Sequence, residues 1–223
     1  ERNRMIPIFV GYDPREAVAY SVFCHSVLRN TREKIAFYPI RGDSVVGSTS
    51  FNAERFKVAK EMGYRGWAIW SECDMLMRPG TDIADLMRYA DSWCDVVVAK
   101  HSYRTKHPVK FLGQKNEDYP RKNWSSLMLI NCAHESWRRL EHTEFSLSEL
   151  HRLAFIKDDR IGALPLEWNW LVGEYDFNEK AKLAHFTVGT PCWEEYSNSD
   201  YADEWRAEKA MMLNYAKAEL AAA

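Results

Sequence analysis

Trp67-Ala-Ile-Trp-Ser-Glu-Cys-Asp-Met-Leu-Met-Arg-Pro-Gly80 contains an apolar run that stops at two acids, Glu72 and Asp74. The run from Trp67 to Trp70 is short, rich in β-favouring residues and followed by a turn signal, so it predicts a buried strand. Apolar residues resume at Met75, which places both carboxylates at the edge of a buried sheet. Carboxylates in such surroundings are costly unless a cation neutralises them.

The chemistry of the acid pair allows two interpretations. Hard oxygen ligands favour Mg²⁺ or Mn²⁺, and such ions commonly hold substrate phosphates. The alternative is a turn at a strand end with solvated acids, because acid-x-acid is a short and common pattern. The position between a buried strand and Pro79-Gly80 supports the metal-site hypothesis.

Size and composition indicate a globular chain. With 223 residues, 46% of them hydrophobic and nine of them Trp, the chain is long enough to form one large domain, expected over residues 1–220. A net charge of −2 gives no global argument for nucleic acid or anionic membrane. The five cysteines are scattered without a CxxC pair, and no run is long enough to span a bilayer. These features predict a cytoplasmic protein with reduced thiols.

One segment, residues 100–123, is polar, long and without clear periodicity. It is expected to be a functional loop that serves as a lid or an acceptor clamp. Its basic side chains form either a solvated surface or a basic groove, and charge patterning alone favours the solvated surface. They are Lys100, His101, Arg104, Lys106, His107, Lys110, Lys115, Arg121 and Lys122.

Predicted strands and helices alternate along the chain, which indicates an α/β fold with a mainly parallel central sheet flanked by helices. Strands are expected at residues 5–10, 34–40, 67–70, 95–99, 127–130 and 183–188. Helices are expected from residue 14 and at 52–62, 81–89, 133–140, 147–155 and 201–218. Ligands of such sheets bind beyond the carboxyl ends of the strands, so residues 11–13 and 72–74 should converge. A dinucleotide site or P-loop is disfavoured, because no Gly-rich phosphate loop is present.

The order of four segments resembles the small GT-A glycosyltransferases of family 8, of the glycogenin and lipopolysaccharide galactosyltransferase type, with their bacterial and phage relatives. The segments are Ile8-Phe-Val-Gly-Tyr-Asp13, Ala68-Ile-Trp-Ser-Glu-Cys-Asp-Met-Leu76, Trp124-Ser-Ser-Leu-Met-Leu-Ile-Asn131 and Leu183-Ala-His-Phe-Thr-Val-Gly-Thr-Pro-Cys-Trp193. The resemblance implies a single Rossmann-like GT-A domain that transfers a hexose from a nucleotide sugar, usually a UDP-sugar, with retention of anomeric configuration.

The resemblance also implies a metal site. Mn²⁺, or Mg²⁺, would bind at Glu72-Cys73-Asp74, where Glu72 replaces the usual first Asp and Asp74 is the safer ligand and the expected catalytic acid. His185 matches the late histidine that is the family's third metal ligand, although a lone histidine is more often structural. The lysine that commonly follows this histidine is absent, and backbone amides near Gly189, or Arg15 and Arg55, are expected to hold the diphosphate instead.

Further donor-site residues are expected by position in the family. Tyr12 and Asp13 match the nucleotide-holding loop, although Asp13 is also explained as a helix cap. Arg55 would face the donor, or alternatively form a surface ion pair. Ser125 and Ser126 match the small-residue pair beside the donor sugar. The family's Asp-Gln-Asp stretch has no clear counterpart, and Asp158 and Asp159, the nearest acids, are the expected catalytic residues in its place.

The acceptor stays open between a saccharide or lipopolysaccharide and a hydroxymethylated DNA base, since related small enzymes are proposed to glycosylate modified DNA. Two other classes remain as alternatives: a nucleotidyltransferase that acts on a sugar phosphate, and a non-catalytic sugar-binding domain.

Overall fold

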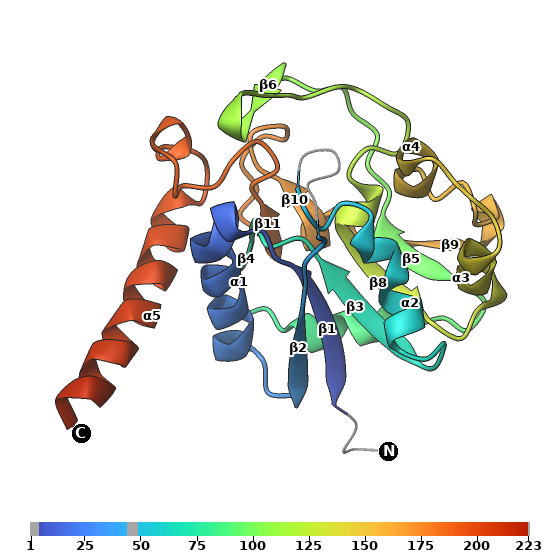
Figure 1. Ribbon diagram of the computed structural model, residues 1–223. Coiled ribbons are helices and arrows are strands. Elements are labelled where there is room, and N and C mark those ends of the chain that lie inside the picture. The colour runs from blue at the N-terminus through green and yellow to red at the C-terminus, as the bar shows by residue number, and fades with distance from the viewer. Residues whose placement is uncertain (1–4, 44–48, 223) are drawn as a thin grey trace.

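The computed structural model describes residues 5–43 and 49–222. Residues 1–4 and 44–48 of the expected domain lie outside the described residues. A six-stranded sheet forms the centre, in the order β2-β1-β3-β8-β5-β9 (Figure 1). Its strands are β1 (Ile6–Gly11), β2 (Ile35–Ile40), β3 (Trp67–Ser71), β5 (Val96–Ala99), β8 (Leu127–Asn131) and β9 (Ile161–Leu164).

The sheet is mixed because β8 runs against both of its neighbours, β3 and β5, whereas the other pairings are parallel. The expectation of a mainly parallel α/β sheet is therefore confirmed with one reversed strand. The reversal matters for function, because the residues that precede β8 reach the same sheet edge as the residues that follow β3. Ser71, the last residue of β3, pairs with Leu127, the first of β8.

A second sheet, in the order β10-β11-β4, extends from this edge. It contains β4 (Met75–Met77), β10 (Trp170–Leu171) and β11 (Leu183–His185). β11 is antiparallel to β4, with His185 opposite Met75. The last predicted strand is therefore shorter than expected, and it ends at the histidine.

Helices cover both sides of the central sheet (Figure 1). On one side α1 packs against β4 and α5, and Ser26 of α1 accepts a hydrogen bond from the Met77 amide. On the other side α2 contacts β3 and α3. The α-helices are α1 (Ala17–Asn30), α2 (Val58–Glu61), α3 (Glu135–Arg138), α4 (Leu147–His151) and α5 (Ala202–Ala222).

Several predicted helices are 3₁₀ helices in part or whole. Residues 81–89 form the 3₁₀ helix Ile83–Tyr89, and Glu54–Lys57 precedes α2. Further 3₁₀ turns are Pro14–Glu16, Phe111–Gly113, Trp124–Ser126, Arg139–Glu141, Asp158–Arg160, Leu166–Asn169 and Glu194–Tyr196. Short 3₁₀ pieces commonly connect elements, and here Trp124–Ser126 leads from the cavity wall into β8.

The polar segment 100–123 contains a short hairpin, β6 (Val109–Lys110) and β7 (Gln114–Lys115). Figure 1 shows this segment arching over the sheet edge where β3 ends. Phe111 anchors it, since its side chain is buried and its amide donates to the Val188 carbonyl. Among the described residues, none of the helices combines the length and apolarity that a bilayer crossing requires.

Candidate active site

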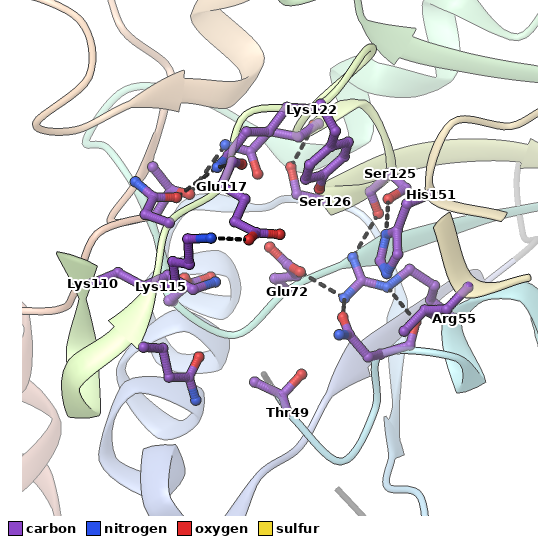
Figure 2. Close-up of a pocket in the computed structure, with 18 of the residues that line it drawn as sticks. Thr49, Arg55, Glu72, Lys110, Lys115, Glu117, Lys122, Ser125, Ser126 and His151 are labelled. Atoms are coloured by element: carbon purple, nitrogen blue, oxygen red, sulfur yellow. Dashed lines mark hydrogen bonds and ion pairs between the residues drawn. The ribbon is translucent and has the colours of Figure 1, made fainter. Parts of the chain in front are cut away.

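A cavity of about 580 Å³ opens at the sheet edge where β3 ends (Figure 2). Its lining comes from the turn after β3, the residues before β8, the helix that carries Arg55, the hairpin segment, α4, and the first turn after β1. The cavity therefore lies beyond the carboxyl ends of parallel strands, as expected for this class of sheet.

Three predicted ligands meet beside this cavity. Glu72 and Asp74 occupy the turn between β3 and β4, and His185 ends β11. The pairing of β11 with β4 and a hydrogen bond from the Phe186 amide to the Asp74 carbonyl (2.8 Å) fix their relation. His185 Nε2 lies 3.3 Å from Glu72 Oε2 and 3.4 Å from Asp74 Oδ1. The three ligand atoms lie within 4.8 Å of one another, a spacing that suits one cation.

The buried polar atoms of this cluster also fit a metal. Asp74 Oδ1 and His185 Nε2 are buried, and among the described residues neither atom has a well-formed hydrogen bond beyond the ion pairs inside the cluster. Unsatisfied buried polar atoms are rare in folded proteins and call for a ligand, an ion or a water. Two carboxylates and an imidazole are an acceptable donor set for Mn²⁺ or Mg²⁺.

Asn169 sets the orientation of the His185 ring. Its Nδ2 donates to Ser126 Oγ (2.8 Å), so its Oδ1 is the acceptor that faces His185 Nδ1 (2.9 Å). Nδ1 then carries a proton, and Nε2 is the ring nitrogen that faces the acids. Burial lowers the pKa of His185, but Asp74 and Glu72 outweigh it and raise this pKa to about 9. A bound cation would displace the Nε2 proton, because only neutral imidazole ligates metal.

Replacing Asn169 by Leu should lower the affinity for Mn²⁺ by roughly 10- to 100-fold, the usual effect of losing a group that orients a metal ligand. Calorimetric titration of Mn²⁺ into the protein measures this. Asn131→Leu is the matched control, because Asn131 is also buried but lies at the far end of β8 and does not line the cavity. Equal Mn²⁺ affinities in the two variants would contradict the orienting role.

Arg55 is fully buried beside the cavity and neutralises Glu72. Its Nη2 lies 2.7 Å from Glu72 Oε1, and its Nη1 donates to the Ser125 carbonyl (3.0 Å). Burial raises the pKa of Glu72, but the Arg55 charge and His185 reverse this and hold it well below its usual range. Arg55 was expected either to face the donor or to form a surface ion pair. The structure places it in the wall of the cavity rather than at the surface.

Ser125 and Ser126 both line the cavity and are buried. Ser125 Oγ hydrogen-bonds His151 Nδ1 (2.9 Å), and the Ser126 carbonyl accepts from the Glu72 amide (3.0 Å). Burial and Arg55 lower the pKa of His151 to about 3, so this ring is neutral near pH 7. The pair before β8 is thus tied directly to the acid turn after β3.

Glu16 is a cavity residue that sequence reasoning missed. It follows the Asp13-Pro14 helix start and appears in sequence only as an acid of the first turn, yet it is buried and lines the cavity. Burial, followed by the nearby Asp74 and Glu72 charges, raises its pKa well above the ordinary value. The available signal was its position in the first turn after β1, at the sheet edge where ligands bind.

The other residues expected near β1 do not line the cavity. Tyr12 packs edge-on against Tyr20, with ring centroids 5.2 Å apart. Asp13 is buried and accepts from the Arg15 amide (3.0 Å), the Arg15 Nη2 (2.6 Å) and the Ser50 amide (3.2 Å). Asp13 is therefore the helix cap, and Arg15 is its partner; their roles at the donor stay a prediction.

Asp13→Ala should destabilise the protein by about 2 kcal/mol at pH 7, the upper end for a lost cap, because the buried Ser50 amide also loses its acceptor. The hydrogen bond from Arg15 lowers the pKa of Asp13 below its ordinary 3.8. The stabilisation is consequently complete above pH 3.8 and fades as the pH falls through the lower folded-state pKa. Urea unfolding should show a smaller difference in free energy of unfolding between wild type and variant at pH 3 than at pH 7. The same difference at both pH values would contradict this prediction.

The structure does not bring Gly189, Asp158 or Asp159 to the cavity lining. A side chain at Gly189 would clash with the Tyr196 ring, 2.2 Å from an added Cβ, so packing explains this glycine. Asp158 is 82% exposed and pairs with Arg121 (2.6 Å). Both acids precede β9, which runs parallel to β5. They therefore lie before the amino end of this strand, whereas the cavity lies beyond the carboxyl ends of the parallel strands.

Similarity to a curated plant protein identifies the family. The chain is 33% identical to Protein CDI of Arabidopsis thaliana over 221 residues, which cover 90% of this chain and 85% of that protein. This chain belongs to the Protein CDI family. No protein-family model matches the chain.

Comparison with solved structures shows the fold of this chain. The chain resembles the bifunctional glycosyltransferase WbbM at a TM-score of 0.69 and 12% identity, over 92% of this chain and 50% of WbbM. GlyE of Streptococcus pneumoniae TIGR4 matches at TM-score 0.65 and 11% identity, over 97% of this chain and 64% of GlyE. The galactosyltransferase LgtC with donor and acceptor sugar analogs matches at 0.58 and 11%, over 92% and 96% of the two chains.

These likenesses establish the GT-A fold that the order of sequence segments predicts. The chain spans half the length of WbbM and 64% of GlyE. Membership of family 8 stays a prediction from the resemblance.

Proposed function

We propose that this chain is a metal-dependent glycosyltransferase that moves a hexose from a nucleotide sugar, a UDP-sugar, to a hydroxyl acceptor. One observation carries the proposal: Glu72, Asp74 and His185 bring three ligand atoms within 4.8 Å of one another beside a cavity in a glycosyltransferase fold. The fold alone would not carry it, because one fold hosts many functions.

Glu72, Asp74 and His185 would hold Mn²⁺ or Mg²⁺. When bound, such an ion neutralises the charge that develops on the departing nucleoside diphosphate. The protein's own residues orient the donor. Arg55 keeps Glu72 ionised, and the Ser125–Ser126 turn forms the wall beside the acids. The hairpin segment lines the cavity and would limit the access of water, which competes with the acceptor.

The donor and stereochemistry follow the family resemblance. Retention predicts that the anomeric configuration of the product equals that of the donor, which the coupling constant of the anomeric proton reports.

For the acceptor we favour a saccharide hydroxyl, since LgtC binds an acceptor sugar analog. A modified-DNA acceptor predicts DNA binding that weakens steeply with salt.

Calorimetric titration of UDP with and without Mn²⁺ tests the proposal. Metal-dependent UDP binding, followed by release of UDP from at least one of several UDP-sugars, is the expected result. Release of inorganic pyrophosphate from UTP and a sugar phosphate would instead support a nucleotidyltransferase. Absence of UDP binding in both titrations would leave the non-catalytic sugar-binding alternative.

A further inference from the structure

Two lysines of the hairpin segment line the cavity without an acidic partner. Lys106 and Lys115 of the same segment form ion pairs with Asp176 and Glu117. Lys110 and Lys122, in contrast, form no ion pair with any residue in the described part of the chain, although both line the cavity. Figure 2 shows them on the hairpin side of the cavity, away from Arg55 and the helix that carries it.

Lys122 is held by neutral oxygens. Only 9% of the residue is exposed, and its Nζ donates to Asn116 Oδ1 and to the Glu117 carbonyl, each at 2.6 Å. An ammonium group has three protons to donate, so one remains for a ligand. Burying a cation among neutral groups is costly unless a counter-charge arrives.

A buried network fixes the position of this ammonium. Asn116 Nδ2 donates to Glu174 Oε1 (3.0 Å) and to the His107 carbonyl (2.7 Å), which turns Asn116 Oδ1 toward Lys122. Glu174 is itself 2% exposed and accepts from the Lys106 amide (2.7 Å). The amide thus separates the carboxylate from the ammonium, and the positive charge stays available to the cavity.

The second lysine, Lys110, adds a further positive charge beside Lys122. Burial, and after it the nearby Lys110, lower the pKa of Lys122 to about 8. Two ammonium groups that face one cavity repel each other, whereas a dianionic group between them would relieve both the repulsion and the burial.

We propose that Lys110 and Lys122 form a phosphate-binding site in the wall opposite Arg55, preorganised by Asn116 and Glu174. The site extends the proposed function, on which the identity of the phosphate rests. This phosphate belongs either to the diphosphate of the nucleotide-sugar donor or to a phosphorylated acceptor. A lysine ammonium is a frequent phosphate ligand.

Calorimetry with inorganic pyrophosphate tests the site directly. Wild type should bind pyrophosphate, and Lys110→Met/Lys122→Met should weaken this binding by roughly 10- to 100-fold, the effect of removing hydrogen bonds to a charged group. Lys115→Met is the matched control, because Lys115 lines the same cavity but is 79% exposed and already paired with Glu117. Equal pyrophosphate affinity in wild type and the double variant would overturn the proposal.

Titrations of UDP in the presence of Mn²⁺ separate the two sources. A weaker affinity for UDP in the double variant, with uridine binding unchanged, assigns the site to the donor. Unchanged UDP affinity, with loss of pyrophosphate binding to the Mn²⁺–UDP complex, assigns it to the acceptor. Wild type could also bind pyrophosphate through the two lysines and yet fail to bind UDP. This result would support the phosphate site and refute the proposed donor.

Folding of each variant is checked by thermal unfolding. If loss of the Lys122 hydrogen bonds unfolds the chain, the single variant Lys110→Met decides, because Lys110 is half-buried and takes no part in the Asn116 network. A Lys110→Met protein that is folded and binds pyrophosphate as tightly as wild type would then overturn the two-lysine site.

Discussion

The Asp74→Asn protein should lose metal-dependent UDP binding and transfer sugar at least about 100-fold more slowly than wild type. Loss of a group that merely orients a ligand costs up to that factor, and Asp74 is expected to be a ligand itself. Its Oδ1 is buried and lies 3.4 Å from Nε2 of His185, the other expected ligand. The near-identical shape of Asn keeps the turn between β3 and β4 in place. UDP titration with Mn²⁺ and release of UDP from a UDP-sugar measure the effect.

Asp158→Asn is the control for this substitution. It makes the same chemical change at an acid that is 82% exposed and does not line the cavity. We expect wild-type Mn²⁺ and UDP binding from it. An Asp74→Asn protein that binds UDP with the same metal dependence as Asp158→Asn would refute the metal site.

Arg55→Met should destabilise the protein by about 3 kcal/mol, the cost of leaving one member of a buried ion pair without its partner. Arg55 is 1% exposed, and Glu72 is 19% exposed and 2.7 Å away. The substitution also removes a donor from the Ser125 carbonyl. Urea unfolding measures the loss. Mn²⁺ should reduce the difference in free energy of unfolding between the variant and wild type, because the ion supplies positive charge beside Glu72.

Arg88→Met provides the comparison for Arg55. Arg88 is 80% exposed and pairs with Asp85 one turn away, so its loss should cost less than about 1 kcal/mol. Equal destabilisation of the two variants, or a difference from wild type that Mn²⁺ leaves unchanged, would show that Arg55 does not neutralise Glu72.

Local sequence patterns predicted most of the elements. The apolar runs that form β1, β3, β5 and β8, and the Asp13-Pro14 helix start, agree with the structure. Periodicity and capping act over a few residues, so they can be read without knowledge of the fold. The strand β9, with its sequence Ile-Gly-Ala-Leu, was missed because it is short and contains glycine.

The direction of β8 was decided by tertiary structure. A strand buried on both faces has the same apolar composition whether it runs parallel or antiparallel to its neighbours. The reversal is nevertheless what carries Ser125 and Ser126 to the acid turn.

The sequence by itself determined that two acids follow a buried strand, and that a histidine occurs late in the chain at the end of an apolar run. Only the tertiary structure decided that β11 pairs with β4, that Asn169 orients His185, and that Arg55 and Glu16 border the same cavity. It also decided which lysines of the polar segment form ion pairs, and that Lys110 and Lys122 line the cavity without one among the described residues. The physical reason is that strand and helix signals arise from neighbouring residues, whereas a site of buried charges exists only where packing removes water from residues far apart in sequence.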